Sequence, residues 1–247
     1  MEAGYDGPDV LIRGNTRIMI IRDNLRLPKP VLLIIATLGW LLLLYLCWIM
    51  VEDGIRRSHF AIGVLAGALT DLDPFNNRYI AHPYQTLIHA GLGILYAVLG
   101  PLQFAAPIRD RFKKFHRVCG RILVPCAVLI GISAITIGLT FPVFGHPANW
   151  VIVVVSGALM IFAFVRAVMF ARQRKLIVHR EWMIRGYAIG ISVAWFRFML
   201  NDVLQPAGLD FMTSWNIVLW TSFPLFVIAA ETWIRLTRPK KKQLTQE

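Results

Sequence analysis

Six separate apolar stretches, each about as long as a lipid bilayer is thick, constrain this 247-residue chain more than any other feature. They occupy residues 30–51, 84–104, 122–144, 149–170, 183–203 and 215–233. A helix rises about 1.5 Å per residue, so roughly 20 apolar residues span a hydrocarbon core of about 30 Å. Because continuous apolar runs lack the alternation of a membrane barrel, we predict an all-α bundle of six transmembrane helices.

Lysine and arginine are unevenly distributed among the segments between these stretches. Twenty of the 26 lie before the first stretch, between the second and third, between the fourth and fifth, or after the sixth. The three alternate segments hold only Arg56, Arg57 and Arg78. Because cytoplasmic segments are enriched in these residues, both termini are predicted to be cytoplasmic. The predicted parts are a cytoplasmic segment at 1–29, a membrane domain at 30–233 and a basic cytoplasmic tail at 234–247.

The formal net charge of +12 could suggest a nucleic-acid-binding protein. The basic residues are instead spread over four segments as topology signals, so we expect the lipid bilayer and its anionic headgroups as partners, and no nucleic acid. The motifs of common enzyme classes, such as Gly-x-Ser-x-Gly, His-Glu-x-x-His and the Walker loop, are absent from the sequence. Whether the chain is an enzyme, and its oligomeric state, stay open.

Histidines in or near the membrane are candidates for chemistry, because polar groups are unfavourable there unless they have a function or a partner. His89 lies well inside the second stretch, and His82 lies nearly above it. His146 follows the third stretch, and His59 lies in the long polar connection at 52–83, which is predicted to form an outside-facing cap. These residues predict an outer group of histidines.

Two segments on the predicted cytoplasmic side have similar chemistry. His116 begins a His-Arg-Val-Cys-Gly-Arg segment before the third stretch, and His179 begins a His-Arg-Glu-Trp-Met-Ile-Arg segment before the fifth. The arginines of these segments are Arg117, Arg121, Arg180 and Arg185. Gly120 leaves room for a flat group or a neighbouring helix. The segments suit an anion such as a haem propionate, a lipid phosphate or a nucleotide phosphate.

The spacing of these histidines resembles a family of bacterial membrane proteins catalogued as domain of unknown function 2306. Its pattern comprises a helix-two histidine, His-Arg-x-x-Gly-Arg and His-x-x-Trp-Met-x-Arg, which this chain matches at His89, 116–121 and 179–185. The resemblance covers about residues 80–205. It implies a helical module of the bacterial inner membrane, without an established reaction.

The layout is also similar, more remotely, to that of transmembrane b-type cytochromes. That likeness implies that His116 and His179 are the axial ligands of an inner haem b, with arginines holding the propionates. It pairs His89 with His82 or His146 at an outer haem iron. Electrons would then cross the membrane to or from a redox partner or a quinone. A transporter, or a lipid-binding or structural protein without a redox cofactor, is the alternative, with His116 and His179 as interfacial residues.

Three arginines fall inside the predicted spans. Arg197, one turn before Asn201, is predicted to extend outward or to bind an anionic ligand. Arg166 is predicted to extend to the cytoplasmic headgroups. Arg185 and Glu231 lie at similar depths, so we predict that they form an ion pair.

Overall fold

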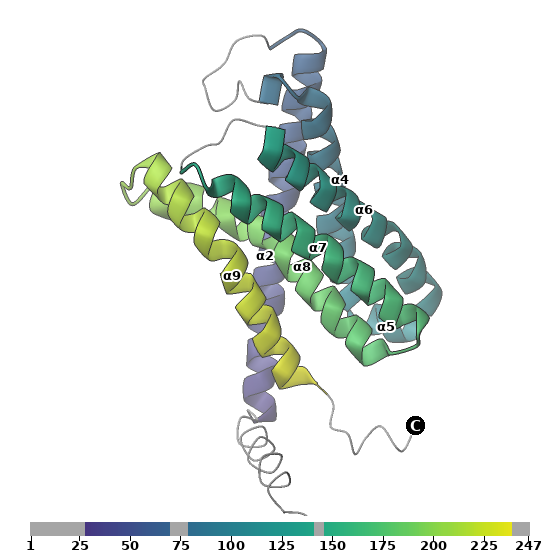
Figure 1. Ribbon diagram of the computed structural model, residues 1–247. Coiled ribbons are helices and arrows are strands. Elements are labelled where there is room, and N and C mark those ends of the chain that lie inside the picture. Colours follow the sequence, from purple (N-terminus) through teal and green to yellow (C-terminus); the bar gives the residue numbers. More distant parts are fainter. Residues whose placement is uncertain (1–27, 70–78, 141–145, 239–247) are drawn as a thin grey trace, which may run out of the picture.

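A computed structural model of the chain describes residues 28–69, 79–140 and 146–238 (Figure 1). Their helices are α2 (Lys29–Leu65), α4 (Pro83–Phe104), α5 (Ala106–Arg111), α6 (Lys113–Thr140), α7 (Asn149–Arg172), α8 (Leu176–Phe198) with its π-helical continuation η1 (Met199–Leu204), and α9 (Phe211–Thr237). Within these ranges, six helices are long and apolar enough to cross a membrane, which confirms the predicted all-α membrane bundle. Most of the predicted cytoplasmic segment and tail, and residues 70–78 of the predicted cap, lie outside the described residues.

The helices pack mainly against their neighbours in the chain. Each of α4, α6 and α7 packs along the next helix in the series that ends at α8 (Figure 1). The first helix, α2, lies against α4 and α8, and α9 lies against α8 and α7. Their shared core contains Leu46, Tyr96, Leu123 and Phe164, each at most 1% exposed. Tyr187 of α8 stacks on Tyr96 of α4, so α2, α4, α6, α7 and α8 surround a common interior.

α2 is much longer than its apolar run. It continues through Glu52 to Leu65, roughly 55 Å in all at about 1.5 Å per residue, so the first part of the polar connection at 52–83 is helical. Gly54 and Ala61 are buried in this extension. A Cβ atom at Gly54 would lie 3.2 Å from the carbonyl oxygen of Ala90, so the glycine permits close packing on α4. This packing holds the polar sequence helical beyond the apolar run.

The first half of α2 carries large apolar side chains on its outer surface. Leu33 is 68% exposed and Leu38 is 60% exposed. A contiguous exposed apolar surface of this kind is characteristic of a helix that contacts lipid. The surface therefore agrees with the membrane location that hydropathy predicts.

Aromatic side chains fill the middle of the bundle where two glycines leave space. A Cβ atom at Gly100 would overlap the Tyr187 ring, and one at Gly190 would overlap Tyr96. The two tyrosine rings stack with centroids 4.8 Å apart. The Tyr96 hydroxyl donates to the Tyr187 carbonyl oxygen at 3.1 Å, which satisfies its polar atom in the interior. The middle of the bundle is therefore filled by these aromatic side chains of the protein itself.

Candidate functional site

Two groups of polar side chains bear on the candidate residues, and this aromatic layer lies between them. The basic end is the end of the bundle at which α4 ends and α6 and α8 begin. The Asp53 cluster comprises Asp53, Arg56, Arg57 and Arg197 and lies where α2 packs beside the outer part of α8. The basic end contains His116 and His179, and the Asp53 cluster acts electrostatically on His89.

His179 is fixed in orientation by the backbone of α7. Its Nδ1 atom lies 2.9 Å from the carbonyl oxygen of Ala167. A carbonyl oxygen can only accept, so Nδ1 carries the proton in this contact and Nε2 of the neutral ring keeps a free lone pair. A ring held through one nitrogen, with the other available as a ligand, is typical of metal-binding histidines.

His116 lies on α6, because this helix begins at Lys113, nine residues before the apolar stretch begins at 122. Its Nδ1 atom is buried and has no hydrogen-bond partner among the described residues. Gln103 of α4 donates to the His116 carbonyl oxygen at 3.2 Å and also occupies the space beside Gly120. The predicted gap at Gly120 therefore receives a neighbouring helix.

The cations of the basic end come partly from residues that the motifs do not contain. Arg109 of α5 lies close enough to His116 and to Arg180 for its charge to act on both. Arg109 also donates to Asp110 at 2.8 Å, and this hydrogen bond lowers the pKa of the Asp110 carboxyl group. His179 also acts electrostatically on His116. The structure thus gathers His116, His179, Arg109 and Arg180.

The other motif arginines have separate surroundings. Arg117 and Arg121 are exposed, and Arg117 donates through Nε to the carbonyl oxygen of Lys113 at 3.2 Å. Arg185 instead forms an ion pair with Glu231, with Nη2 3.1 Å from Oε2, which confirms the predicted pair. The structure therefore does not place these three arginines in one anion site with Arg180.

Arg166 lies among aromatic rings rather than in an ion pair. Its guanidinium carbon lies 4.8 Å from the centroid of the Phe170 ring and 5.7 Å from that of Trp182. Such contacts stabilise a cation where little water is available. The sequence predicted that Arg166 extends to the lipid headgroups. In the structure its guanidinium contacts aromatic rings of the protein.

Asp53 is the centre of the second polar group. Its side chain is 7% exposed, and one of its oxygens lies 3.0 Å from Nη1 of Arg197 on α8. Arg56 donates to the other oxygen at 2.5 Å, and Nε of Arg57 lies 3.8 Å from it. Arg197 therefore extends to Asp53, which supplies a counter-charge inside the protein.

His89 packs beside this cluster. Its Nδ1 atom lies 2.6 Å from Oγ of Ser133 on α6, and Ser133 donates its own proton to the carbonyl oxygen of Ile130. The serine oxygen must then accept from His89, so Nδ1 carries the proton. Arg197 and Asp53 are the charged groups that act on the ring.

The other outer histidines have local roles. Nδ1 of His146 accepts from the backbone N–H of Ala148 at 3.1 Å, next to the start of α7. His82 precedes α4, and its carbonyl oxygen accepts from Thr86. His59 lies on the extension of α2. Within the described ranges no group of three or more His, Cys, Asp or Glu side chains is arranged to hold a metal ion.

Sequence reasoning missed three residues of these sites. Asp53 stood in a supposed connection, Arg109 lay outside the His-Arg motifs, and Ser133 was one of many small residues in an apolar helix. The acidic residue next to a long apolar helix was a usable signal for Asp53, because an ionisable group at that depth needs a partner. No pattern in the sequence distinguished Ser133.

Fold and polar sites together define a multi-pass helical membrane protein with ionisable groups buried between its helices. A family model described as Predicted membrane protein (DUF2306) matches residues 86–234 of the chain. The protein therefore belongs to this family, as the motifs around His89, His116 and His179 predicted. No curated protein and no solved structure matches the chain significantly.

Proposed function

We propose that this protein binds one haem b between His116 and His179 at the basic end and uses it to transfer electrons. The observation that carries the proposal is the hydrogen bonding of the two histidine rings. The His179 ring is oriented by Ala167 with Nε2 left as a lone pair, and His116 nearby has a buried nitrogen without a partner. The two rings come from α8 and α6, which begin at the same end of the bundle.

The unpartnered nitrogen of His116 supports a bound group on energetic grounds. A buried polar atom without a hydrogen bond destabilises a protein by about 1–3 kcal/mol, so such atoms are rare unless a ligand or function accounts for them. A metal-bound imidazole needs a partner for the nitrogen that does not bind the metal. A bound group at this position would either take Nδ1 of His116 as a ligand or give it a hydrogen-bond partner.

The surrounding cations support an anionic cofactor. Arg109 lies close enough to act electrostatically on both His116 and Arg180. Among the described residues, Asp110 already bonds to Arg109, and Glu181 pairs with Arg238 at 2.7 Å. Arg180 is oriented by a hydrogen bond from Nη2 to Oγ1 of Thr237 at 2.9 Å. These arginines would hold the propionates, and His116 and His179 would bind the iron.

A bound haem b supplies a one-electron redox centre whose potential depends on its ligands, hydrogen bonds and burial. The protein residues hold the group, orient the imidazoles and limit access of water. A redox protein or a quinone is the expected electron-exchange partner.

We propose one haem rather than the two that the cytochrome likeness implied. Tyr96 and Tyr187 fill the middle of the bundle, and Nδ1 of His146 already accepts from the backbone at α7. His89 is held by Ser133 beside the Arg197 cation. Like His179, His89 keeps Nε2 as a lone pair, but the charged groups that act on its ring are Arg197 and Asp53 rather than a second histidine.

The test is a reduced-minus-oxidised visible spectrum of detergent-purified protein expressed with ample haem. We expect a b-type absorption band in the native protein and in His89→Ala, and its loss in His116→Ala and in His179→Ala. Each variant is first checked for insertion and for a single monodisperse species. His59→Ala is a matched histidine control, because its side chain is exposed on α2.

Absence of the band from the native protein would contradict the haem proposal and favour a transporter or a lipid-binding or structural protein. Loss of the band in His89→Ala, with retention in His179→Ala, would move the haem to the Asp53 side. Equal loss in the His59→Ala control would show that the signal does not report on ligation.

A further inference from the structure

A groove runs along α2 beside the Asp53 cluster, and its two adjoining hollows differ in chemistry. One, of about 410 Å³, is mainly apolar, and the other, of about 270 Å³, is mainly polar. Both are lined by Trp48, Glu52 and Arg56, so they form one continuous surface. A groove with a polar part and an apolar part suits an amphiphile rather than a soluble polar ligand.

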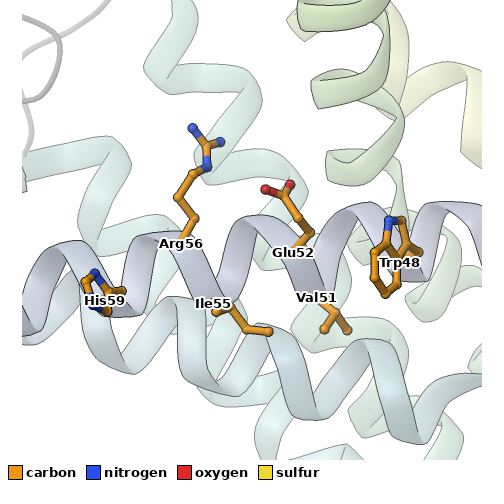
Figure 2. A pocket seen from close by; sticks show the side chains of 6 residues that line it. All are labelled: Trp48, Val51, Glu52, Ile55, Arg56 and His59. Carbon is orange, nitrogen blue, oxygen red and sulfur yellow. The ribbon is translucent and has the colours of Figure 1, made fainter.

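The apolar hollow follows one side of the helix. Figure 2 shows Val51 and Ile55 projecting to one side of α2, while Glu52 and Arg56 project together to the other. Trp48 is 67% exposed and Ile55 is 57% exposed. Apolar and aromatic side chains next to charged ones are typical of the membrane interface, where the hydrocarbon chain of a lipid meets its head group.

The polar hollow offers two guanidinium groups that are held in position. Arg56 and Arg197 each bind the buried Asp53 carboxylate through one terminal nitrogen, and both line the hollow. A guanidinium has five N–H donors in a rigid plane, so donors remain on each for a second acceptor. The spacing is set by Asp53 before any ligand arrives, which lowers the entropy lost on binding.

The same hollow also offers two carboxylates. Glu52 and Asp202 line it, and neither has a hydrogen bond or ion pair with another residue in the described part of the chain. Asp202 lies in η1, the π-helical continuation of α8, which turns this segment beside α2. The lining therefore has two carboxylates available for a cation, besides Asp53, and two guanidiniums that share Asp53 and keep donors for an anion.

We propose that this groove binds one zwitterionic phospholipid with a primary-amine head group. The phosphate accepts from Arg56 and Arg197, and the ammonium donates to Glu52 and Asp202. An acyl chain lies along Val51 and Ile55. An anionic phospholipid without an amine leaves the two carboxylates unpaired and repelled by its charge, so the groove discriminates against it. This site is independent of the proposed haem.

Native mass spectrometry of the full chain in detergent tests the site, with phosphatidylethanolamine and phosphatidylglycerol of the same acyl chains added at equal concentrations. We expect phosphatidylethanolamine to occupy one site with about fivefold higher affinity, the value of about 1 kcal/mol for one exposed ion pair. Glu52→Gln combined with Asp202→Asn should bring the ratio to about one. The charge-matched control is Asp110→Asn combined with Asp210→Asn, two exposed carboxylates outside the groove, and it should keep the native ratio.

A second measurement locates the lipid. Phosphatidylethanolamine brominated on its acyl chains should quench more tryptophan fluorescence in the native protein than in Trp48→Phe. Equal affinity for the two lipids, or a preference that survives the Glu52 and Asp202 changes, would overturn the proposal. So would displacement of the lipid by glycerophosphoethanolamine at equal concentration, because the apolar hollow would then contribute nothing.

Discussion

The Asp53 cluster and the basic end are both polar, but their charges are arranged in opposite ways. At the cluster, one buried carboxylate lies within ion-pair distance of three guanidinium groups from two helices. At the basic end, two histidines lie among arginines, and Asp110 is exposed and already bonded to Arg109.

This difference separates a group that supports the fold from a group that lacks a partner. Asp53 satisfies the cations around it and joins α2 to α8, so its contribution is to stability. The basic end leaves Nδ1 of His116 unpartnered, and its cations face few carboxylates, so we propose that its contribution is to binding. Substitutions at the two places should therefore affect different measurements.

The largest expected effect is at the centre of the Asp53 cluster. Asp53→Asn leaves Arg56, Arg57 and Arg197 without their counter-charge, which should lower the free energy of unfolding by about 3 kcal/mol. Thermal unfolding in detergent can be followed with a thiol-reactive fluorophore, because Cys47, Cys119 and Cys126 are buried until the protein unfolds.

The control for Asp53→Asn is Asp110→Asn, an exposed carboxylate at the basic end, which should leave the unfolding temperature unchanged. Equal shifts in the two variants would break the comparison between the ends. It would mean that the Asp53 cluster does not support the fold more than an exposed surface pair does.

The next effect tests the aromatic layer that separates the two ends. Gly100→Ala places a methyl group where the Tyr187 ring lies, and this overpacking should lower stability by about 2 kcal/mol. Gly91→Ala on the same helix meets no atom within 4 Å and should be neutral or raise stability by up to about 1 kcal/mol. Similar unfolding temperatures for the two variants would show that the middle of the bundle is open.

A smaller effect is expected at His89. Ser133→Ala removes the acceptor for Nδ1–H of His89 and should lower stability by about 1 kcal/mol without changing a haem spectrum. Thr136→Ala, one turn along α6, removes an exposed hydroxyl that bonds only within its own helix and should have no measurable effect. A changed spectrum in Ser133→Ala would contradict the separate roles of the two ends.

The smallest effect concerns the ion pair between Arg185 and Glu231. Their side chains are 25% and 36% exposed, so screening should limit the coupling energy to less than about 1 kcal/mol. A double-mutant cycle with Arg185→Gln and Glu231→Gln measures this coupling by thermal unfolding. A coupling as large as the loss in Asp53→Asn would remove the distinction between a partly exposed pair and a buried one.

Several features of the fold were readable in the sequence because they depend on the order of residues alone. Apolar length predicted the six membrane helices, and the motifs around His116 and His179 identified the family. The ion pair between Arg185 and Glu231 was predictable because both positions followed from counting along helices that run in opposite directions. These inferences depend on the depth of each residue in the membrane and not on the rotation of each helix about its axis.

The composition of the two polar sites was not readable in the same way. Arg197 was expected to extend outward or to bind an anionic ligand, and it pairs with Asp53 of another helix. Ser133 meets His89 across 44 positions of sequence, and Gln103 fills the space at Gly120. Each contact depends on which face of one helix meets which face of another, a quantity that spacing within one helix does not specify.

The sequence by itself determined that this chain is a helical membrane protein with six spans and a family-specific pattern of histidines and arginines, because hydropathy and motif spacing are local properties. Only the tertiary structure decided that α2 extends to Leu65, that Asp53 gathers three arginines, and that His116 is left with an unpartnered nitrogen near His179. Those outcomes follow from helix rotation and close packing, which bring together side chains from segments far apart in the chain.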